Sequence, residues 1–272
     1  MKPIFLDFET YWDVNHSLSR MSPTEYIQDS KTEIISVAIK EGLDGDTYVL
    51  FGEEKIRDHL QSMDWSDKMA VGHNMSGFDS MILAWRMGVN PKMYGCTAAM
   101  ARSQYSKTGV TVDGKFLIGV SLKKLAAELK IGKKLDLEAT NTKGKYLKDF
   151  TPEELTAMSK YNKVDTDLCA ELFVHLAKGF PRQELAIIDM TTRMLVEPKF
   201  VLDTGMVDEA LEVVKAEKTR SLLELAETLG VVGDDVEEQI RSELASAAKF
   251  GALLNKLGVE NMKKIEIGRA HV

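Results

Sequence analysis

The alternation of hydrophobic and polar positions predicts an α/β domain at the start of the chain. Apolar runs typical of strands occupy residues 3–9, 33–41, 46–52 and 68–74. The link GLDG at 42–45 is short enough to join the second and third of these runs as a hairpin. Helical spacing covers 53–63 and 76–88, and Gly88 is expected to end the second of these helices. Strands and helices that alternate in this way indicate a mixed sheet covered by helices.

The middle of the chain predicts two helices between polar segments. The glycine- and threonine-rich residues 104–120 are expected to form a loop or a hairpin, and the lysine-rich residues 132–149 another loop. Between them, Ser121 is a suitable N-cap for a short helix over 121–131. A longer pattern over 151–177 begins with a capping-box spacing and predicts one long helix, or two that nearly join.

The residues GFP at 179–181 interrupt the helical pattern and predict a domain boundary. Beyond them, strand-like spacing occurs only at 199–203, and heptad-like spacing over 205–230 favours an all-helical segment. We therefore expect a domain at 1–181, a helical segment at 182–265 and a separate tail at 266–272. The tail, EIGRAHV, matches the translation of a common sequencing adapter. We expect it not to belong to the natural protein, whose chain should continue into a polymerase domain missing here.

Composition agrees with a soluble globular protein, because 44% of the residues are hydrophobic and 28% are charged. No apolar run reaches the roughly 18 residues that a membrane span needs. No signal peptide precedes the first strand, so we expect a cytoplasmic protein with no membrane partner. The two cysteines, Cys96 and Cys169, indicate a reducing compartment and are expected to be small buried hydrophobic residues.

The net charge of −7 hides a local excess of positive charge. Residues 107–149 contain ten lysines and five acids, while the remainder of the chain is acidic. This region is either a solvated lysine-rich surface or a track for nucleic-acid phosphates. Charge alone does not distinguish a solvated surface from a phosphate-binding track. The chemistry of nearby residues has to be considered as well.

The first strand carries two carboxylates on one face. In IFLDFET (4–10), Asp7 and Glu9 are two residues apart, and side chains alternate faces along a strand. Two carboxylates this close repel each other and lose hydration when they are buried, and a bound divalent cation would compensate both effects. The pattern D-x-E is common by chance, so by itself it is weak evidence for a metal site. Its position in an apolar strand makes the evidence stronger.

A second acid follows the fourth strand. Asn74 closes that strand, and Phe78 and Asp79 lie in the first turn of the next helix. The simpler explanation of Asp79 is that its negative charge interacts favourably with the N-terminus of the helix. The combination with a strand-end asparagine is less common and points to a site.

A third pattern lies on the long helix. Tyr161 and Asp165 are four residues apart and therefore share one face of that helix. The simpler explanation is an exposed tyrosine above a solvated acid. Asp167 could compete for the role of Asp165, but it lies on another face from Tyr161.

In this order, the three motifs resemble the DEDD (DnaQ-like) family of 3′–5′ exonucleases, whose fold is ribonuclease-H-like. Residues 7–9 match its D-x-E motif, residues 74–79 match N-x3-[FY]-D, and residues 161–165 match the Y-x3-D of its tyrosine subclass, DEDDy. The histidine subclass would have His in place of Tyr161. All four acids of the pattern are present.

The resemblance extends to the exonuclease domain of phage-type family A DNA polymerases. The stretch from residue 94 through 121–131 to the Y-x3-D helix is similar to that domain. Residues 184–212 are similar to its passage into the polymerase thumb. Residues 246–259 are similar to a later thumb helix. There the dipeptide Lys249-Phe250 departs from the Gln-Leu that the family tends to have, which weakens this last part.

The resemblance implies a mixed five-stranded sheet flanked by helices and two divalent cations, Mg²⁺ or Mn²⁺. It assigns metal binding and catalysis to Asp7, Glu9, Asp79 and Asp165. It assigns catalysis also to Tyr161, whose hydroxyl would orient the attacking water. It assigns contact with the terminal nucleotide to Thr10, Asn74 and Phe78, although core packing explains Phe78 nearly as well.

The implied activity is the release of 5′-mononucleotides from the 3′ end of single-stranded DNA, as the proofreading part of a DNA polymerase. The alternatives are a stand-alone nuclease acting on DNA or RNA, and a non-catalytic module that binds single strands. We expect a monomer, in the cytoplasm of a bacterial host if a phage encodes it. The strand should follow the lysine-rich region, where Phe116 or Tyr105 could stack on bases, though core or loop packing explains each equally well. His73 is expected to have a structural role at a strand end.

Overall fold

The computed structural model describes residues 1–106, 111–112, 115–116, 119–135, 142–233 and 235–259. The tail at 266–272, expected to derive from an adapter, lies outside the described residues. The chain divides into two compact units, Met1–Lys199 and a second one from Phe200 onward. Each unit is described by itself.

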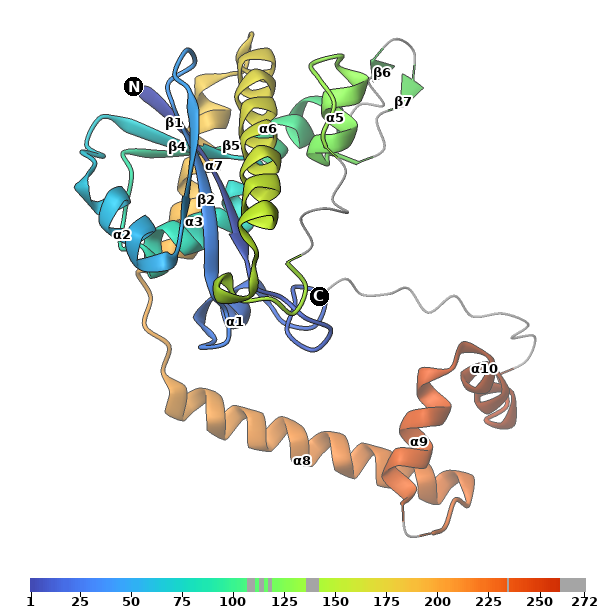
Figure 1. Cartoon of the computed structure of the whole chain (residues 1–272). Coiled ribbons are helices and arrows are strands. Elements are labelled where there is room, and N and C mark those ends of the chain that lie inside the picture. The colour runs from blue at the N-terminus through green and yellow to red at the C-terminus, as the bar shows by residue number, and fades with distance from the viewer. Residues whose placement is uncertain (107–110, 113–114, 117–118, 136–141, 234, 260–272) are drawn as a thin grey trace. The chain divides into compact units, whose positions relative to one another are not determined.

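A five-stranded sheet forms the centre of the first unit (Figure 1). Its strands are β1 (Lys2–Thr10), β2 (Ile34–Glu41), β3 (Thr47–Phe51), β4 (Lys68–Gly72) and β5 (Met93–Cys96). Their order is β3-β2-β1-β4-β5, with β2 antiparallel to β1 and β3, and with β4 and β5 parallel to β1. This confirms the predicted fold class, a ribonuclease-H-like α/β fold with a mixed five-stranded sheet flanked by helices. The hydrophobic pattern had predicted four strands individually, and the short β5 is the one it missed.

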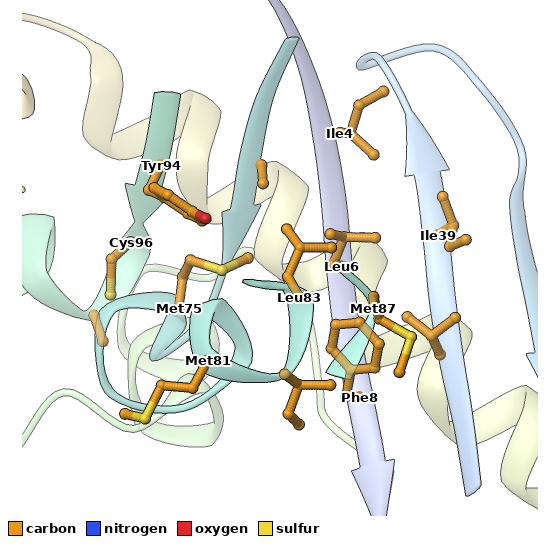
Figure 2. Packing of buried hydrophobic residues seen from close by; sticks show 14 of the residues in the cluster. Ile4, Leu6, Phe8, Ile39, Met75, Met81, Leu83, Met87, Tyr94 and Cys96 are labelled. Carbon is orange, nitrogen blue, oxygen red and sulfur yellow. The ribbon is translucent and has the colours of Figure 1, made fainter. Parts of the chain in front are cut away.

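The two faces of β1 bury different partners. Ile4, Leu6 and Phe8 belong to the main core, which includes α2 (Glu53–Ser62) and the turns around α3 (Asp79–Met81). Figure 2 shows Leu6 and Phe8 beside methionine and leucine side chains from those turns. Phe5 faces the other way and packs in a smaller cluster with Cys169 and Ala170. Because Asp7 and Glu9 share the face of Phe5, they lie on this second side of the sheet.

The second side is covered by one long helix, α6 (Pro152–Ala177), which contacts β1, β2 and β3. Its N-terminus has the predicted capping box. Thr151 Oγ1 accepts a hydrogen bond from the Glu154 N–H at 3.2 Å, and Glu154 Oε2 accepts one from the Thr151 N–H at 3.0 Å. The sequence predicted either one long helix or two that nearly join, and the structure has one.

The helix predicted over 76–88 is broken into short pieces. They are the 3₁₀ turn η1 (Met75–Gly77), α3 and the π-helical η2 (Ile82–Arg86). Phe78 interrupts the run, because its φ of −152° and ψ of −67° are not helical. Gly88 ends the run with a φ of +70°, as its lack of a side chain permits.

The first unit also contains several short elements. They are α1 (Pro23–Gln28), α4 (Thr97–Ala101), η3 (Arg102–Ser106), β6 (Thr111–Val112), β7 (Lys115–Phe116), α5 (Leu122–Glu128) and η5 (Leu147–Asp149). β6 and β7 pair as a small hairpin, and Ser121 caps α5 as predicted. Helix α1 was missed, although Ser22 and Glu25 form a capping box at its start.

Helix α7 (Arg182–Val196) belongs to the first unit, and this corrects the boundary expected at 181. Its Ile188 and Val196 are buried in the main core. Its Asp189 Oδ1 accepts a hydrogen bond from the Tyr94 N–H of the edge strand β5 at 2.8 Å. The break at residues 179–181 is therefore a turn within a unit, and the division falls after Lys199.

The second unit is helical, as predicted, with α8 (Thr204–Leu229), α9 (Val236–Ala245) and α10 (Ala247–Lys256). A small cluster of Leu222, Ala226 and Ile240 packs α8 against α9. The strand expected at 199–203 does not form: the side chains of Phe200 and Val201 are 96% and 97% exposed, and Asp203 caps α8. Within the described residues, no helix is both long and apolar enough to cross a membrane.

Candidate functional site

Asp7 and Glu9 lie near the C-terminal end of β1 and face α6. Their partners across the β1–β2 ladder are Ala38 and Ser36, whose small side chains leave room above the strand. Ser36 Oγ accepts a hydrogen bond from Asn162 Nδ2 of α6 at 2.7 Å. This bond holds the helix against the sheet directly beside Glu9.

Asp79 reaches the same place from the end of β4. Because β4 runs parallel to β1, the chain that leaves β4 emerges at the same edge of the sheet as the C-terminal end of β1. Asp79 is buried at the start of α3, and its Oδ1 accepts a hydrogen bond from the Phe8 N–H at 3.4 Å. This hydrogen bond joins Asp79 of the second motif to Phe8, which lies between Asp7 and Glu9 of the first motif.

Tyr161 and Asp165 project from α6 toward the two acids of β1, and both are buried. Asp165 Oδ2 forms an ion pair with Lys134 Nζ at 2.5 Å, and this nitrogen lies 5.0 Å from the centroid of the Tyr161 ring. Asp165 Oδ1 is buried and has no hydrogen-bond partner. An orphaned carboxylate oxygen in a buried site is unusual and needs an explanation.

The four carboxylates raise the cost of one another's ionisation. Burial raises the pKa of Asp7 well above its usual range, and Glu9, Asp79 and Asp165 raise it further. Burial raises the pKa of Glu9 to about 7, and Asp165 adds to this effect. Burial likewise raises the pKa of Asp79 to about 7, although the Phe8 N–H opposes the rise. The site therefore favours an additional positive charge.

The donor set suits a divalent cation. Carboxylate oxygens are the ligands that Mg²⁺ and Mn²⁺ prefer, and Asp165 Oδ1 is a buried oxygen with no other partner. In the part of the chain that is described, no three His, Cys, Asp or Glu side chains are already arranged so that they could hold an ion. The carboxylate oxygens of the site suit a divalent cation. One of the expected ligands, Asp165, is paired with the Lys134 ammonium.

Tyr161 is suited to donate a hydrogen bond and not to act as a base. Burial raises the pKa of its hydroxyl, and Asp165 and Glu9 raise it too, against a hydrogen bond from Lys134 that lowers it. The phenol therefore stays protonated at neutral pH. A protonated hydroxyl above the carboxylates can orient a water molecule.

The residues expected to contact a nucleotide differ in position. The Thr10 hydroxyl lies in the core, 2.8 Å from the Tyr26 hydroxyl, so its side chain turns away from the acids. Asn74 is exposed in a left-handed conformation with φ of +83°. Phe78 is partly buried against the main core, with its ring 6.1 Å from that of Tyr26. This packing favours a core role for Phe78 over contact with a nucleotide. Of the three residues, Asn74 is the one whose side chain is exposed.

The end of β1 is joined to the lysine-rich region. Trp12 O accepts a hydrogen bond from the Gly144 N–H at 2.7 Å, and Tyr11 stacks on Tyr146 with ring centroids 4.2 Å apart. Trp12 is 38% exposed, with Lys143 Nζ lying 5.7 Å from the centroid of its ring. The sequence patterns did not single out Trp12, although its position three residues after Glu9 was a signal.

The other candidates have structural partners. His73 bridges Thr97 Oγ1 and the Val120 carbonyl, both at 2.9 Å, and burial lowers its pKa to about 4, which agrees with the expected structural role. Asp167 pairs with Lys40 at 3.1 Å and is separate from the acidic cluster. Tyr105 packs against the main core, and the side chain of Phe116 lies outside the described residues. Both cysteines are free and buried, as predicted.

No protein-family model matches the chain, and no curated protein matches it. Among solved structures, it is similar to the family B DNA polymerase from the hyperthermophilic archaeon Pyrobaculum calidifontis, at 15% identity and a TM-score of 0.44. The likeness covers 70% of this chain and 27% of that polymerase. A likeness of this degree carries no argument about activity, so a function must be inferred from the residues of the site.

Proposed function

We propose that this chain is a 3′–5′ exonuclease that hydrolyses the terminal phosphodiester bond of single-stranded DNA with two divalent cations, Mg²⁺ or Mn²⁺. One observation carries the proposal. Four carboxylates from three distant segments, residues 7–9, 79 and 165, converge beneath a protonated tyrosine and mutually raise the cost of their ionisation. A protein would not bury such a cluster for stability alone, because each ionised carboxylate there costs free energy.

The roles follow from the positions. Asp7 interacts with each of the other three acids and would help to hold both cations. Glu9 and Asp165 would complete one cation site, the latter through its orphaned Oδ1, and Asp79 would hold the second. When bound, the cations activate a water and stabilise the leaving oxygen of the phosphodiester. Tyr161 would orient that water through its hydroxyl.

The single strand would approach over the end of β1. Trp12 offers an exposed ring there, next to Lys143, and a base can stack on such a ring whatever its sequence. Lys148, whose Nζ lies 5.9 Å from the centroid of the Tyr146 ring, adds positive charge on the same segment. Such contacts are independent of base identity and weaken as salt rises.

The motifs also support a narrower assignment, to the tyrosine subclass of DEDD exonucleases in phage-type family A DNA polymerases. In that case the domain proofreads for a polymerase, and the helical second unit begins the thumb. The alternative is a stand-alone nuclease. Every candidate residue lies within the unit Met1–Lys199, so this unit would hold the site in either case.

The test is digestion of a 5′-labelled single-stranded DNA with Mg²⁺, Mn²⁺ or EDTA. We expect a metal-dependent ladder that shortens from the 3′ end. We expect a loss of about 10³-fold or more in Asp7→Ala, because losing cation stabilisation costs several kcal/mol of transition-state energy. Asp167→Ala removes an acid outside the cluster and should retain the activity. If the intact protein binds the strand but never shortens it with either metal, the proposal is wrong.

A further inference from the structure

Lys134 contributes a positive charge to the acidic cluster from outside the three motifs. It lies in the segment after α5, and this segment runs close against α6 at Gly132. A Cβ added to Gly132 would lie 2.6 Å from Leu168 Cδ2, so only glycine allows this approach without displacement. The close approach brings Lys134 over the same face of α6 that carries Tyr161 and Asp165.

The ammonium of Lys134 compensates part of the negative charge of the acids. It pairs with Asp165 Oδ2 at 2.5 Å and hydrogen-bonds the Tyr161 hydroxyl. Its charge also lowers the pKa values of Asp7 and Glu9, against the other influences that raise them. Lys134 thus performs, with one charge, part of what a divalent cation would do at this place.

A cation on the free oxygen of Asp165 would lie within a few ångströms of the Lys134 ammonium. Two positive charges at that separation repel, and the repulsion is strong in a partly buried site. The Lys134 side chain is 22% exposed and has a flexible four-carbon stem, so it has a path to solvent. Asp165 is 4% exposed on a rigid helix and cannot move away as easily.

We propose that Lys134 is an internal counter-ion of the carboxylate cluster and that a divalent cation displaces it, so that this residue sets the metal affinity of the site. The inference rests on the proposed function for the identity of the cation. It adds a residue that belongs to none of the exonuclease motifs. It also explains why the acids can be buried together before a metal ion binds.

The first test compares Mn²⁺ binding to wild type, Lys134→Met and Lys134→Arg, with free Mn²⁺ measured by electron paramagnetic resonance. Lys134→Met keeps the length of the side chain but removes its charge. We expect its Mn²⁺ dissociation constant to fall about tenfold or more, because no ammonium has to be displaced. Lys134→Arg keeps the charge and should bind Mn²⁺ about as weakly as the wild type. Lys133→Met removes an exposed neighbouring lysine and should also leave the affinity unchanged.

The outcomes separate the inference from the proposed function. Mn²⁺ binding that is unchanged or weaker in Lys134→Met would overturn the inference, since the lysine would then be neutral or helpful to the bound metal. Wild-type protein that binds no Mn²⁺ would overturn both.

A second measurement uses the wild type and does not depend on folding of a variant. Amine-reactive labelling, read by mass spectrometry, should modify Lys134 slowly in EDTA and several-fold faster with saturating Mg²⁺. Labelling of Lys133 should not change. If Lys134 stays equally protected while Mg²⁺ is bound, the ammonium is not displaced and the inference fails.

Discussion

At the scale of single residues, Asp79 and Glu9 show how burial makes the ionised form of a carboxylate costly. Both pKa values rise to about 7, mainly because the charged form is removed from water. Asp79 keeps one backbone N–H as a partner, and Asp165 keeps Lys134. The remaining negative charge has few compensating groups in the described part of the site, so the metal-free protein should respond strongly to pH.

We predict that the metal-free protein loses stability as pH rises from about 4 to about 8. The folded-state pKa values of Glu9 and Asp79 lie above their usual 4.5 and 3.8, so the folded state binds more protons than the unfolded state in this window. Raising the pH through the folded-state pKa values therefore removes stability. Saturating Mg²⁺ should abolish the slope, because a bound cation favours ionised carboxylates. Urea unfolding at several pH values, in EDTA and in Mg²⁺, measures this.

Asp79→Asn provides the matched variant for this pH dependence. At pH 8 in EDTA it should be about 1–3 kcal/mol more stable than the wild type, because the amide never ionises. Below about pH 4 the difference should nearly vanish, since the carboxyl is then largely protonated in both the folded and the unfolded state. Asp167→Asn lies outside the cluster and should show no such gain. Stability that increases between pH 5 and pH 8 in EDTA would contradict the assignment.

At the scale of elements, the site depends on where α6 and the segment at 142–150 are attached. Helix α6 is anchored beside Glu9 by the bond from Asn162 to Ser36, and its N-terminus is closed by the capping box. The segment at 142–150 is joined to the end of β1 through Trp12 and Tyr11. One attachment positions Tyr161 and Asp165, and the other presents Trp12 at the edge of the site.

We predict that Trp12→Ala weakens binding of single-stranded DNA by about fivefold or more, because stacking of a base on an aromatic ring contributes about 1–3 kcal/mol. Binding is measured by fluorescence anisotropy in an Asp7→Ala background, which prevents cleavage. Trp12→Phe should retain most of the affinity, since it keeps a ring. Leu18→Ala removes an exposed apolar side chain of the following loop and should have no effect. Equal affinities in all four proteins would remove Trp12 from the substrate path.

At the scale of the whole molecule, every candidate residue lies in the unit Met1–Lys199. Helix α7 completes that unit, because it covers the edge strand β5 and buries Ile188 and Val196. Trp85 Nε1 also donates a hydrogen bond to the Val196 carbonyl at 3.0 Å. The chemistry should therefore need α7 but not the helices that follow Lys199.

We predict that a chain ending at Lys199 folds and keeps the proposed metal-dependent exonuclease activity. A chain ending at Pro181 should lose at least about 4 kcal/mol of stability, because two buried apolar side chains and two hydrogen bonds are removed. Urea unfolding and the labelled-strand assay on both truncations distinguish the two boundaries. Equal stability of the two chains would show that α7 contributes little and would restore the boundary at 181.

Features that depend only on neighbouring residues could be predicted before the fold was known. Alternation along β1 places Asp7 and Glu9 on one face, and the four-residue spacing places Tyr161 and Asp165 on one side of α6. The capping box specifies where α6 begins. These features could be predicted because strand and helix geometry repeat over a few residues.

Which of these faces meet, and which other residues join them, depends on how distant segments pack. The bond from the Phe8 N–H to Asp79 depends on the parallel pairing of β1 with β4, and the ion pair of Lys134 with Asp165 depends on the path of the chain after α5. The membership of α7 in the first unit and the core position of Phe78 depend on packing between distant segments. No local pattern encodes such contacts, because the burial and charge that select them exist only once the chain has folded.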